Sequence, residues 1–207
     1  MAVTGLILVS FVCVHLLGNL SLFAGADAIN TYAAKLQSLG PIVWIFRAVM
    51  LAVFAVHVGF GIQLTVQNNA ARPVGYLQKV NERSTFSSRS MIVTGGVLFI
   101  FIVWHLAHFT GHVGVDTAKF AGAAADGHFD VYGMVTTAFS SAFYFILYAV
   151  GMACLFLHLA HGVGSFFQSL GLTSECTLDG VGVFGKAVSF ILLVGYFAVI
   201  ICGAVKA

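Results

Sequence analysis

Five long apolar stretches alternate with short polar segments along the chain. They cover residues 2–24, 41–66, 90–113, 142–170 and 183–205. Each is long enough to cross the hydrocarbon core of a bilayer as a helix, which takes about 20 residues. Only helices and closed barrels satisfy their own backbone in lipid, and the alternating pattern of a membrane barrel is absent. The pattern predicts an all-α integral membrane protein, a single bundle of five transmembrane helices over residues 1–207.

Composition excludes the main alternatives to a membrane protein. Hydrophobic residues make up 60% of the 207 residues and charged residues only 8%, whereas soluble domains have roughly 25% charged residues. A soluble domain of this size could not bury so much apolar surface, and a disordered chain would need far more charge. The four cysteines are scattered without a C-x-x-C pair. The sequence therefore predicts no zinc ribbon, covalent haem or iron–sulfur cluster in this chain, and no basic cluster suggests a nucleic-acid partner.

Loop charges indicate an orientation in the membrane. Basic residues concentrate in the 67–89 loop, and the loops on the other side hold fewer: Arg72, Lys79, Arg83 and Arg89 against Lys35 and Lys119. Because cytoplasmic loops are enriched in Lys and Arg, we expect the 67–89 loop and the N-terminus in the cytoplasm. Residues 1–25 contain no Lys or Arg, so we interpret the first stretch as a retained helix and not a cleaved signal. The mildly amphipathic segment 129–141 is predicted to lie along the outer surface.

Histidines occupy the apolar stretches in an unusual number. Of the eight histidines, seven lie in or at the ends of predicted helices: His15, His57, His105, His108, His112, His158 and His161. Ionisable side chains are costly inside a membrane and usually serve a function there. At least one histidine in each of four consecutive helices is more than isolated helix–helix hydrogen bonds explain. His128 falls in a loop, and we interpret it as solvated.

The depths of four of these histidines form two layers. His15 and His105 lie 9 and 8 residues from the outer ends of their stretches, and His57 and His158 lie 9 and 12 residues from the inner ends. At about 1.5 Å of rise per residue, each pair shares a level. Two facing neutral imidazoles at one level are the axial ligands that a six-coordinate haem b needs. The sequence therefore predicts two stacked haems b, one per layer.

Nearby glycines favour these four histidines over their neighbours. Gly5 and Gly95 each follow a threonine and precede a histidine by ten residues, and Gly61 and Gly162 follow His57 and His158 by four. A small residue one turn from a ligand leaves room for the flat macrocycle. His108 and His161 are left as contacts to a haem propionate or a quinone, or as hydrogen-bonding partners of a neighbouring helix.

Other residues and other chemistries complete the candidate set. Arg47, Arg89 and Lys186 are candidate partners of haem propionates, with anchoring at the membrane interface as the alternative. His105, His108 and His112 have a spacing suited to zinc or copper, but such sites usually add a carboxylate or thiol. No Asp or Glu lies in a predicted helix, which argues against a proton pump or an ion-coupled transporter. Electron transfer is the simpler interpretation.

Several short segments, taken in order, resemble the five-helix dihaem cytochrome b that anchors succinate dehydrogenase and fumarate reductase to the membrane. They are Thr4-Gly5 with His15 and Asn19, Asn30-x-Tyr32, His57, Ala70-Ala71-Arg72-Pro73, Ser88-Arg89-x-Met91-Ile92, Trp104-His105, Asp130-Val131-Tyr132, His158-x-x-His161-Gly162, Ser165-Phe166 and Gly171-Leu172. The resemblance covers almost the whole chain. It implies that His57 and His158 ligate a proximal haem, nearer the cytoplasm, and that His15 and His105 ligate a distal haem.

The same resemblance implies partners and a reaction. A docked iron–sulfur subunit would carry a flavoprotein with covalent FAD, where the succinate–fumarate chemistry takes place, and the whole complex is a candidate dimer. This chain would exchange electrons with a quinone, expected to be menaquinone, in a bacterial or archaeal cytoplasmic membrane. Lys35 and Gln37, with His112 nearby, are candidates for the family's quinone site near the distal haem, with a solvated loop and a surface histidine as the alternative. Some members carry a glutamate two residues before the fourth-helix ligand; Phe156 stands there, so proton transfer through that position is not expected.

Two alternatives stay open at this point. One is a cytochrome b anchor of another quinone-linked oxidoreductase, of the formate dehydrogenase or hydrogenase type. The other is a haem-free membrane transporter or anchor. The sequence also leaves the physiological direction open, because succinate oxidation and fumarate reduction use the same anchor architecture.

Overall fold

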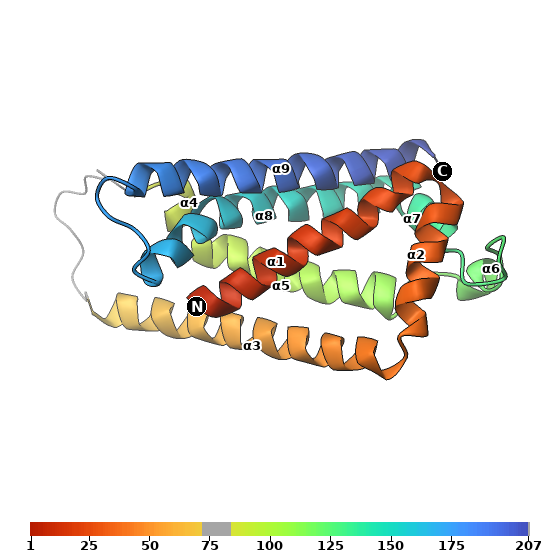
Figure 1. Ribbon diagram of the computed structural model, residues 1–207, viewed down its shortest axis with the longest axis horizontal. Helices are drawn as coiled ribbons and strands as arrows, with labels where there is room; N and C mark the ends of the chain where they lie inside the picture. Colours follow the sequence, from red (N-terminus) through yellow and green to blue (C-terminus); the bar gives the residue numbers. More distant parts are fainter. Residues whose placement is uncertain (72–83, 207) are drawn as a thin grey trace.

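A computed structural model describes residues 1–71 and 84–206, and every element in these ranges is helical. Five helices are long and apolar enough to cross a membrane: Ala2–Ala24, Pro41–Ala70, Met91–Thr110, Ala142–Ser169 and Leu178–Val205. They run roughly along one common axis (Figure 1). The predicted all-α bundle of membrane-spanning length is confirmed. The second helix continues beyond the predicted span to Ala70, and the fifth already begins at Leu178.

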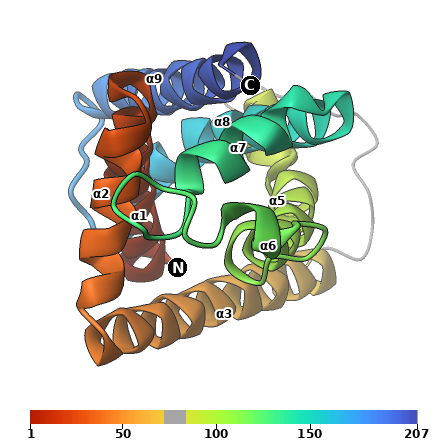
Figure 2. The same cartoon turned by 90° about the vertical axis from the view of Figure 1, so that its right-hand side faces the viewer.

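Shorter helices join the long ones. The first long helix comprises α1 (Ala2–Asn19) and the 3₁₀ segment η1 (Leu20–Ala24). The third comprises α5 (Met91–His105) and the π-helical segment η2 (Leu106–Thr110). The other three are α3 (Pro41–Ala70), α8 (Ala142–Ser169) and α9 (Leu178–Val205). The connecting helices are α2 (Ala26–Ser38), α4 (Phe86–Arg89), α6 (Thr117–Phe120) and α7 (Val131–Ser140). Helices α2, α6 and α7 gather at one end of the bundle, and α4 and the N-terminus lie toward the other (Figures 1 and 2).

Helix α2 was not predicted from the hydrophobic pattern. It is rich in alanine, a strong helix former, and its only buried residues are Ile29 and Asn30. Gly25 and Gly40 flank it with φ of 101° and 54°. Glycine adopts these backbone angles at little steric cost, so the chain can turn sharply on both sides of α2. The helix therefore crosses the end of the bundle between α1 and α3 (Figure 2).

The amphipathic segment near residue 130 forms helix α7, but its apolar face is covered by the chain itself. Five of its residues are buried: Met134, Val135, Thr136, Ala138 and Phe139. They are buried because α7 packs against α9, α8 and α2. The segment therefore forms a helix that packs on the chain itself, and its place on the outer side of the membrane stays a prediction.

Helix α9 contains no histidine and packs through its glycines. A Cβ atom built on Gly185 would lie 3.1 Å from the backbone nitrogen of Gly164 in α8, and one on Gly195 would lie 2.6 Å from the side chain of Leu16 in α1. Lipid supplies no hydrophobic drive between helices, so close contact at small residues is a main source of their association. The glycines of α9 therefore allow it to pack closely against neighbouring helices.

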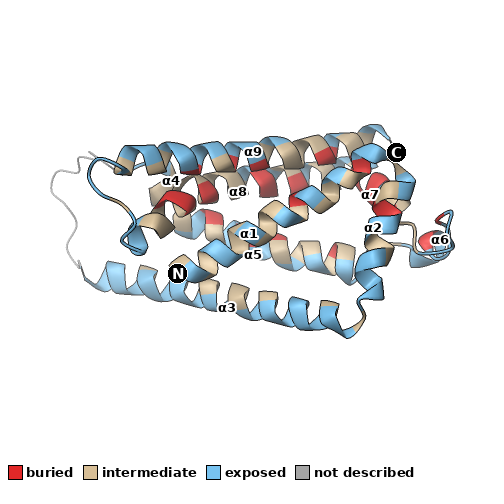
Figure 3. Cartoon of the chain, in the orientation of Figure 1, coloured by how far each residue is buried: buried red, intermediate tan, exposed pale blue. Residues whose placement is uncertain are grey.

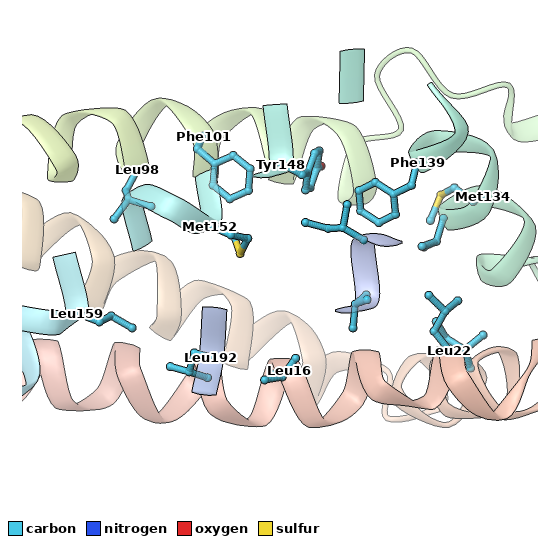
Figure 4. Close-up of a cluster of buried hydrophobic side chains, with 14 of the residues drawn as sticks. Leu16, Leu22, Leu98, Phe101, Met134, Phe139, Tyr148, Met152, Leu159 and Leu192 are labelled. Atoms are coloured by element: carbon cyan, nitrogen blue, oxygen red, sulfur yellow. The ribbon is translucent and has the colours of Figure 1, made fainter. Parts of the chain in front are cut away.

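The buried side chains gather where α1, α5, α7, α8 and α9 meet. Phe101, Phe139, Tyr148, Met152 and Leu192 are among them (Figure 4). Helix α3 has no buried residue along its length (Figure 3). It contacts α1 and α5, so it stands at the side of the bundle opposite α9 (Figure 1).

Part of the predicted cytoplasmic loop lies outside the described residues. Arg72, Lys79 and Arg83, and with them the Arg72-Pro73 part of one family-like segment, fall within residues 72–83. Arg89, at the end of α4, is described and exposed. The orientation of the chain in the membrane stays a prediction.

Candidate functional site

The structure brings together both histidine pairs that the sequence predicts. The imidazole rings of His15 in α1 and His105 in α5 have centroids 5.8 Å apart and cross at 82°. The rings of His57 in α3 and His158 in α8 have centroids 6.4 Å apart and cross at 65°. Each pair joins one helix that precedes residue 72 to one that follows residue 83. We call these the His15–His105 pair and the His57–His158 pair.

These separations suit two imidazoles bound to one metal ion. An imidazole nitrogen lies about 2 Å from a metal that it ligates, so two rings on opposite sides of one ion have centroids roughly 6 Å apart. The separations of both pairs are therefore compatible with two ligands of one haem iron. Packed aromatic rings also lie at such distances, as His105 and Tyr148 do at 5.8 Å.

Threonines hold the rings of the His57–His158 pair. The Oγ1 atom of Thr4 in α1 lies 3.1 Å from Nδ1 of His57, and Oγ1 of Thr94 in α5 lies 3.2 Å from Nδ1 of His158. The following glycines touch the same rings. A Cβ on Gly5 would lie 3.4 Å from Cε1 of His57, and one on Gly95 would lie 3.3 Å from Cε1 of His158.

The His15–His105 pair lies among aromatic rings. Phe11 stacks on His15 at 5.5 Å, and Phe101 stacks on His105 at 6.0 Å. Asn19 donates from Nδ2 to the backbone carbonyl of His15 across 2.7 Å. The Nδ1 atom of His105 is buried and has no hydrogen-bond partner among the described residues. Buried polar atoms are rarely left unpaired, so this observation favours a ligand-binding role for His105 over a purely structural one.

His108 has a different environment from His105. His108 is 1% exposed. Its Nδ1 atom lies 3.1 Å from the hydroxyl oxygen of Tyr148 in α8. Its ring stacks on the rings of Phe109 and Tyr144, each at a centroid distance of 4.4 Å. Of the two roles that the sequence left open, the structure gives His108 a hydrogen bond to a neighbouring helix.

The π-helical segment η2 begins directly after His105, and such segments frequently occur at functional sites.

The remaining histidines lie apart from the two pairs. His161 is half-buried in α8, one turn beyond His158. His112 has a φ of 55° and stacks on Phe129 at 5.2 Å. His128 is exposed, and its Nδ1 atom lies 3.2 Å from the carboxylate of Asp126. The backbone N–H of His128 donates to that carboxylate and lowers the pKa of Asp126.

The basic and polar residues proposed to contact propionates or a quinone are all exposed: Arg47, Arg89, Lys186, Lys35 and Gln37. The guanidinium of Arg47 lies 4.8 Å from the ring centroid of Trp44, and Arg89 donates to the carbonyl of Ser84. Within the described residues, no hydrogen bond or ion pair links these five side chains to the histidine pairs. Their roles stay predictions.

Two of the family-like segments meet where α2 crosses α7. The side chain of Asn30 donates to Oδ1 of Asp130 across 2.9 Å and accepts from the backbone N–H of Tyr132 across 3.0 Å. Asp130 also caps α7, because its Oδ1 accepts from the backbone N–H of Gly133. Asn30 is 4% exposed. From the sequence these residues were only marks of resemblance; the structure shows that they join α2 to α7.

The structure gives no support to a zinc or copper site on the third long helix. In residues 1–71 and 84–206, no group of three or more His, Cys, Asp or Glu side chains could hold a metal ion. A haem iron takes at most two protein ligands, so this finding does not bear on the two pairs.

Sequence reasoning missed the contacts of Thr4 and Thr94. It used the two Thr-Gly dipeptides as markers of their own helices, whereas each contacts a histidine of a different helix. Thr4 precedes His15 by the same number of residues as Thr94 precedes His105. This repeated spacing was the signal that the two threonines have the same role.

The family resemblance rests on the short segments alone. Comparison of the chain with protein-family models, with curated proteins and with solved structures gives no match.

Proposed function

We propose that this chain is a membrane cytochrome b that holds two haems b and passes electrons between a quinone and a partner protein on the cytoplasmic side. The observation that carries the proposal is the facing of two histidines at each of two levels, with ring centroids 5.8 and 6.4 Å apart. The buried Nδ1 atom of His105, which has no hydrogen-bond partner among the described residues, adds support. Four helices contribute the four histidines, as expected of cofactor sites in a bundle core.

In this proposal each pair would hold one haem: His15 and His105 the distal haem, and His57 and His158 the proximal haem. When bound, the haem supplies one-electron redox chemistry. The chain keeps the facing rings at a fixed separation, and the stacked Phe11 and Phe101 exclude water around the distal pair. Because the pairs lie at successive depths, they offer a path for electrons across the membrane.

We further propose that the partners are those of succinate dehydrogenase and fumarate reductase. The resemblance of the short segments supports an iron–sulfur subunit and a flavoprotein with FAD on the cytoplasmic side, with menaquinone as the electron carrier. Helix α2, which carries Lys35 and Gln37, lies at the end of the bundle where α1 ends (Figure 1), and His15 stands four residues before that end. This placement agrees with a quinone site beside the distal haem.

Haem quantification on the purified chain tests the core of the proposal. We expect a dithionite-reduced minus oxidised spectrum typical of cytochrome b and two haems per chain by pyridine haemochrome. His15→Ala and His57→Ala should each lower the content to one haem. The matched control is His128→Ala, since His128 is exposed and lies in a loop, and it should retain two haems. A wild-type chain without haem would leave a haem-free transporter or anchor as the better interpretation.

Copurification from the native membrane tests the partners. A flavoprotein with covalently bound flavin and an iron–sulfur protein should accompany the chain and should transfer electrons between succinate or fumarate and a quinone. Association with a molybdenum or nickel enzyme instead would favour the formate dehydrogenase or hydrogenase type of anchor.

A further inference from the structure

The threonines beside the His57–His158 pair show which of their atoms donates. The hydroxyl of Thr4 donates to the carbonyl of Met1 across 2.9 Å, and that of Thr94 donates to the carbonyls of Ser90 and Met91 across 3.0 and 3.2 Å. A hydroxyl has one hydrogen to donate. With that hydrogen placed on a backbone carbonyl of its own helix, each threonine oxygen acts as an acceptor toward the histidine.

With the threonine hydrogens on these carbonyls, one tautomer of both histidines is favoured. Because the threonine oxygens accept, Nδ1 of His57 and Nδ1 of His158 carry the hydrogen in the bonds of 3.1 and 3.2 Å. A neutral imidazole with hydrogen on Nδ1 has its free lone pair on Nε2. Both rings of the pair are thus prepared to bind a metal through Nε2, which is the arrangement that a second hydrogen-bonding partner usually enforces on a histidine ligand.

The neighbouring glycines leave room for the two rings. A Cβ on Gly5 or Gly95 would approach Cε1 of His57 or His158 to 3.4 or 3.3 Å, so a larger residue there would crowd the ring. In each Thr-Gly dipeptide the threonine thus contacts Nδ1 and the glycine leaves the space that the ring needs. The His15–His105 pair lacks this arrangement at His105, whose Nδ1 has no partner among the described residues.

From this geometry we infer that Thr4 and Thr94 are positioning residues that fix the tautomer and orientation of His57 and His158 and raise their basicity as ligands of the haem between them. The inference rests on the proposed function and adds two residues to it. A more basic imidazole stabilises ferric over ferrous iron, so the threonines lower the reduction potential of this haem. Loss of such a partner typically costs roughly 10- to 100-fold in metal affinity.

Redox titration of the whole protein, together with haem quantification, tests the inference. The variants are Thr4→Val and Thr94→Val, which keep the branched shape and remove the acceptor. Each should raise the midpoint potential of one haem and weaken its retention, while the other haem keeps its potential. If the affinity for the haem falls tenfold in the ferric state only, the midpoint potential rises by about 59 mV for a one-electron couple. Thr4→Ser and Thr94→Ser should restore wild-type behaviour, because serine keeps the hydroxyl.

The matched control is Thr65→Val. Thr65 lies in α3 and donates to the carbonyl of Gly61, as Thr4 and Thr94 donate to their own helices, but it has no histidine contact among the described residues. Wild-type potentials in both valine variants, in a protein that holds two haems, would overturn the inference and leave the proposed function standing. Equal loss in the serine and valine variants would also overturn it, since it would indicate a packing role. A wild-type chain without haem would overturn both.

Discussion

Asn30 and Asp130, 100 residues apart in the sequence, share a hydrogen bond of 2.9 Å that ties α2 to the first turn of α7. The other atom of the Asn30 amide accepts from the backbone of Tyr132. Since Asp130 also caps α7, one buried amide fixes the position of both short helices at this end of the bundle. The predicted quinone residues Lys35 and Gln37 lie on the same α2 helix.

Removing this amide should loosen the end of the bundle. Asn30→Ala leaves the backbone N–H of Tyr132 buried without its acceptor and removes a donor from Asp130, so we expect a loss of about 1.5–3 kcal/mol of stability. Thermal unfolding in detergent, followed by circular dichroism, measures the effect. Asp27→Ala, an exposed position on the same helix, is the control and should unfold as the wild type does. Equal unfolding of Asn30→Ala and the wild type would contradict the assigned role.

Double variants should reveal which histidines act together. His15→Ala with His105→Ala removes two ligands from one layer, so the double variant should retain one haem, as each single variant does. His15→Ala with His57→Ala removes a ligand from each layer and should retain none. Pyridine haemochrome on detergent-purified protein distinguishes the patterns. Complete loss in the first double variant, with retention in the second, would show that the pairing is wrong.

His108 should contribute to stability and not to haem content. Tyr148→Phe removes the hydroxyl that lies 3.1 Å from Nδ1 of His108 and leaves a buried ring nitrogen unpaired, at a cost of about 1–3 kcal/mol. The variant should therefore unfold more easily while its spectrum shows two haems. Tyr32→Phe, which changes an exposed tyrosine, controls for the loss of a hydroxyl. Loss of one haem in Tyr148→Phe would assign His108 to the cofactor site.

The close approach of α8 and α9 should depend on Gly185. A Cβ there would lie 3.1 Å from the backbone nitrogen of Gly164, and backbone moves less readily than a side chain. We expect Gly185→Ala to destabilise the bundle by about 1–3 kcal/mol, the usual cost of overpacking. Gly182→Ala, whose added Cβ meets no described atom within 4 Å, is the matched control in the same helix. If both variants had equal melting temperatures, the contact would not limit the packing.

The pattern of apolar stretches was sufficient to predict the long helices, because length and hydropathy alone determine whether a segment can cross a bilayer. The same pattern missed α2, because this helix is not apolar overall and its position depends on one buried asparagine. It also missed that α9 covers the apolar face of α7. Such packing depends on contacts between distant segments, which a hydropathy profile does not contain.

Depth along each helix placed His15 with His105 and His57 with His158, and the structure agrees on both pairs. Depth could do this because the helices are nearly parallel, so position along the chain translates into height. It could not show which ring atoms face which neighbour. The contacts of Thr4 and Thr94 depend on helix rotation, which the sequence pattern alone left undetermined.

The division of each histidine pair between the two halves of the chain has a consequence for biogenesis. A nascent chain has no complete pair until α5 has been made, and the His57–His158 pair must wait for α8. Until then His15 and His57 stand in apolar helices without the opposite ring. Any ligand that needs both rings of a pair can therefore bind only after most of the chain has entered the membrane, and a chain truncated before α5 has neither pair.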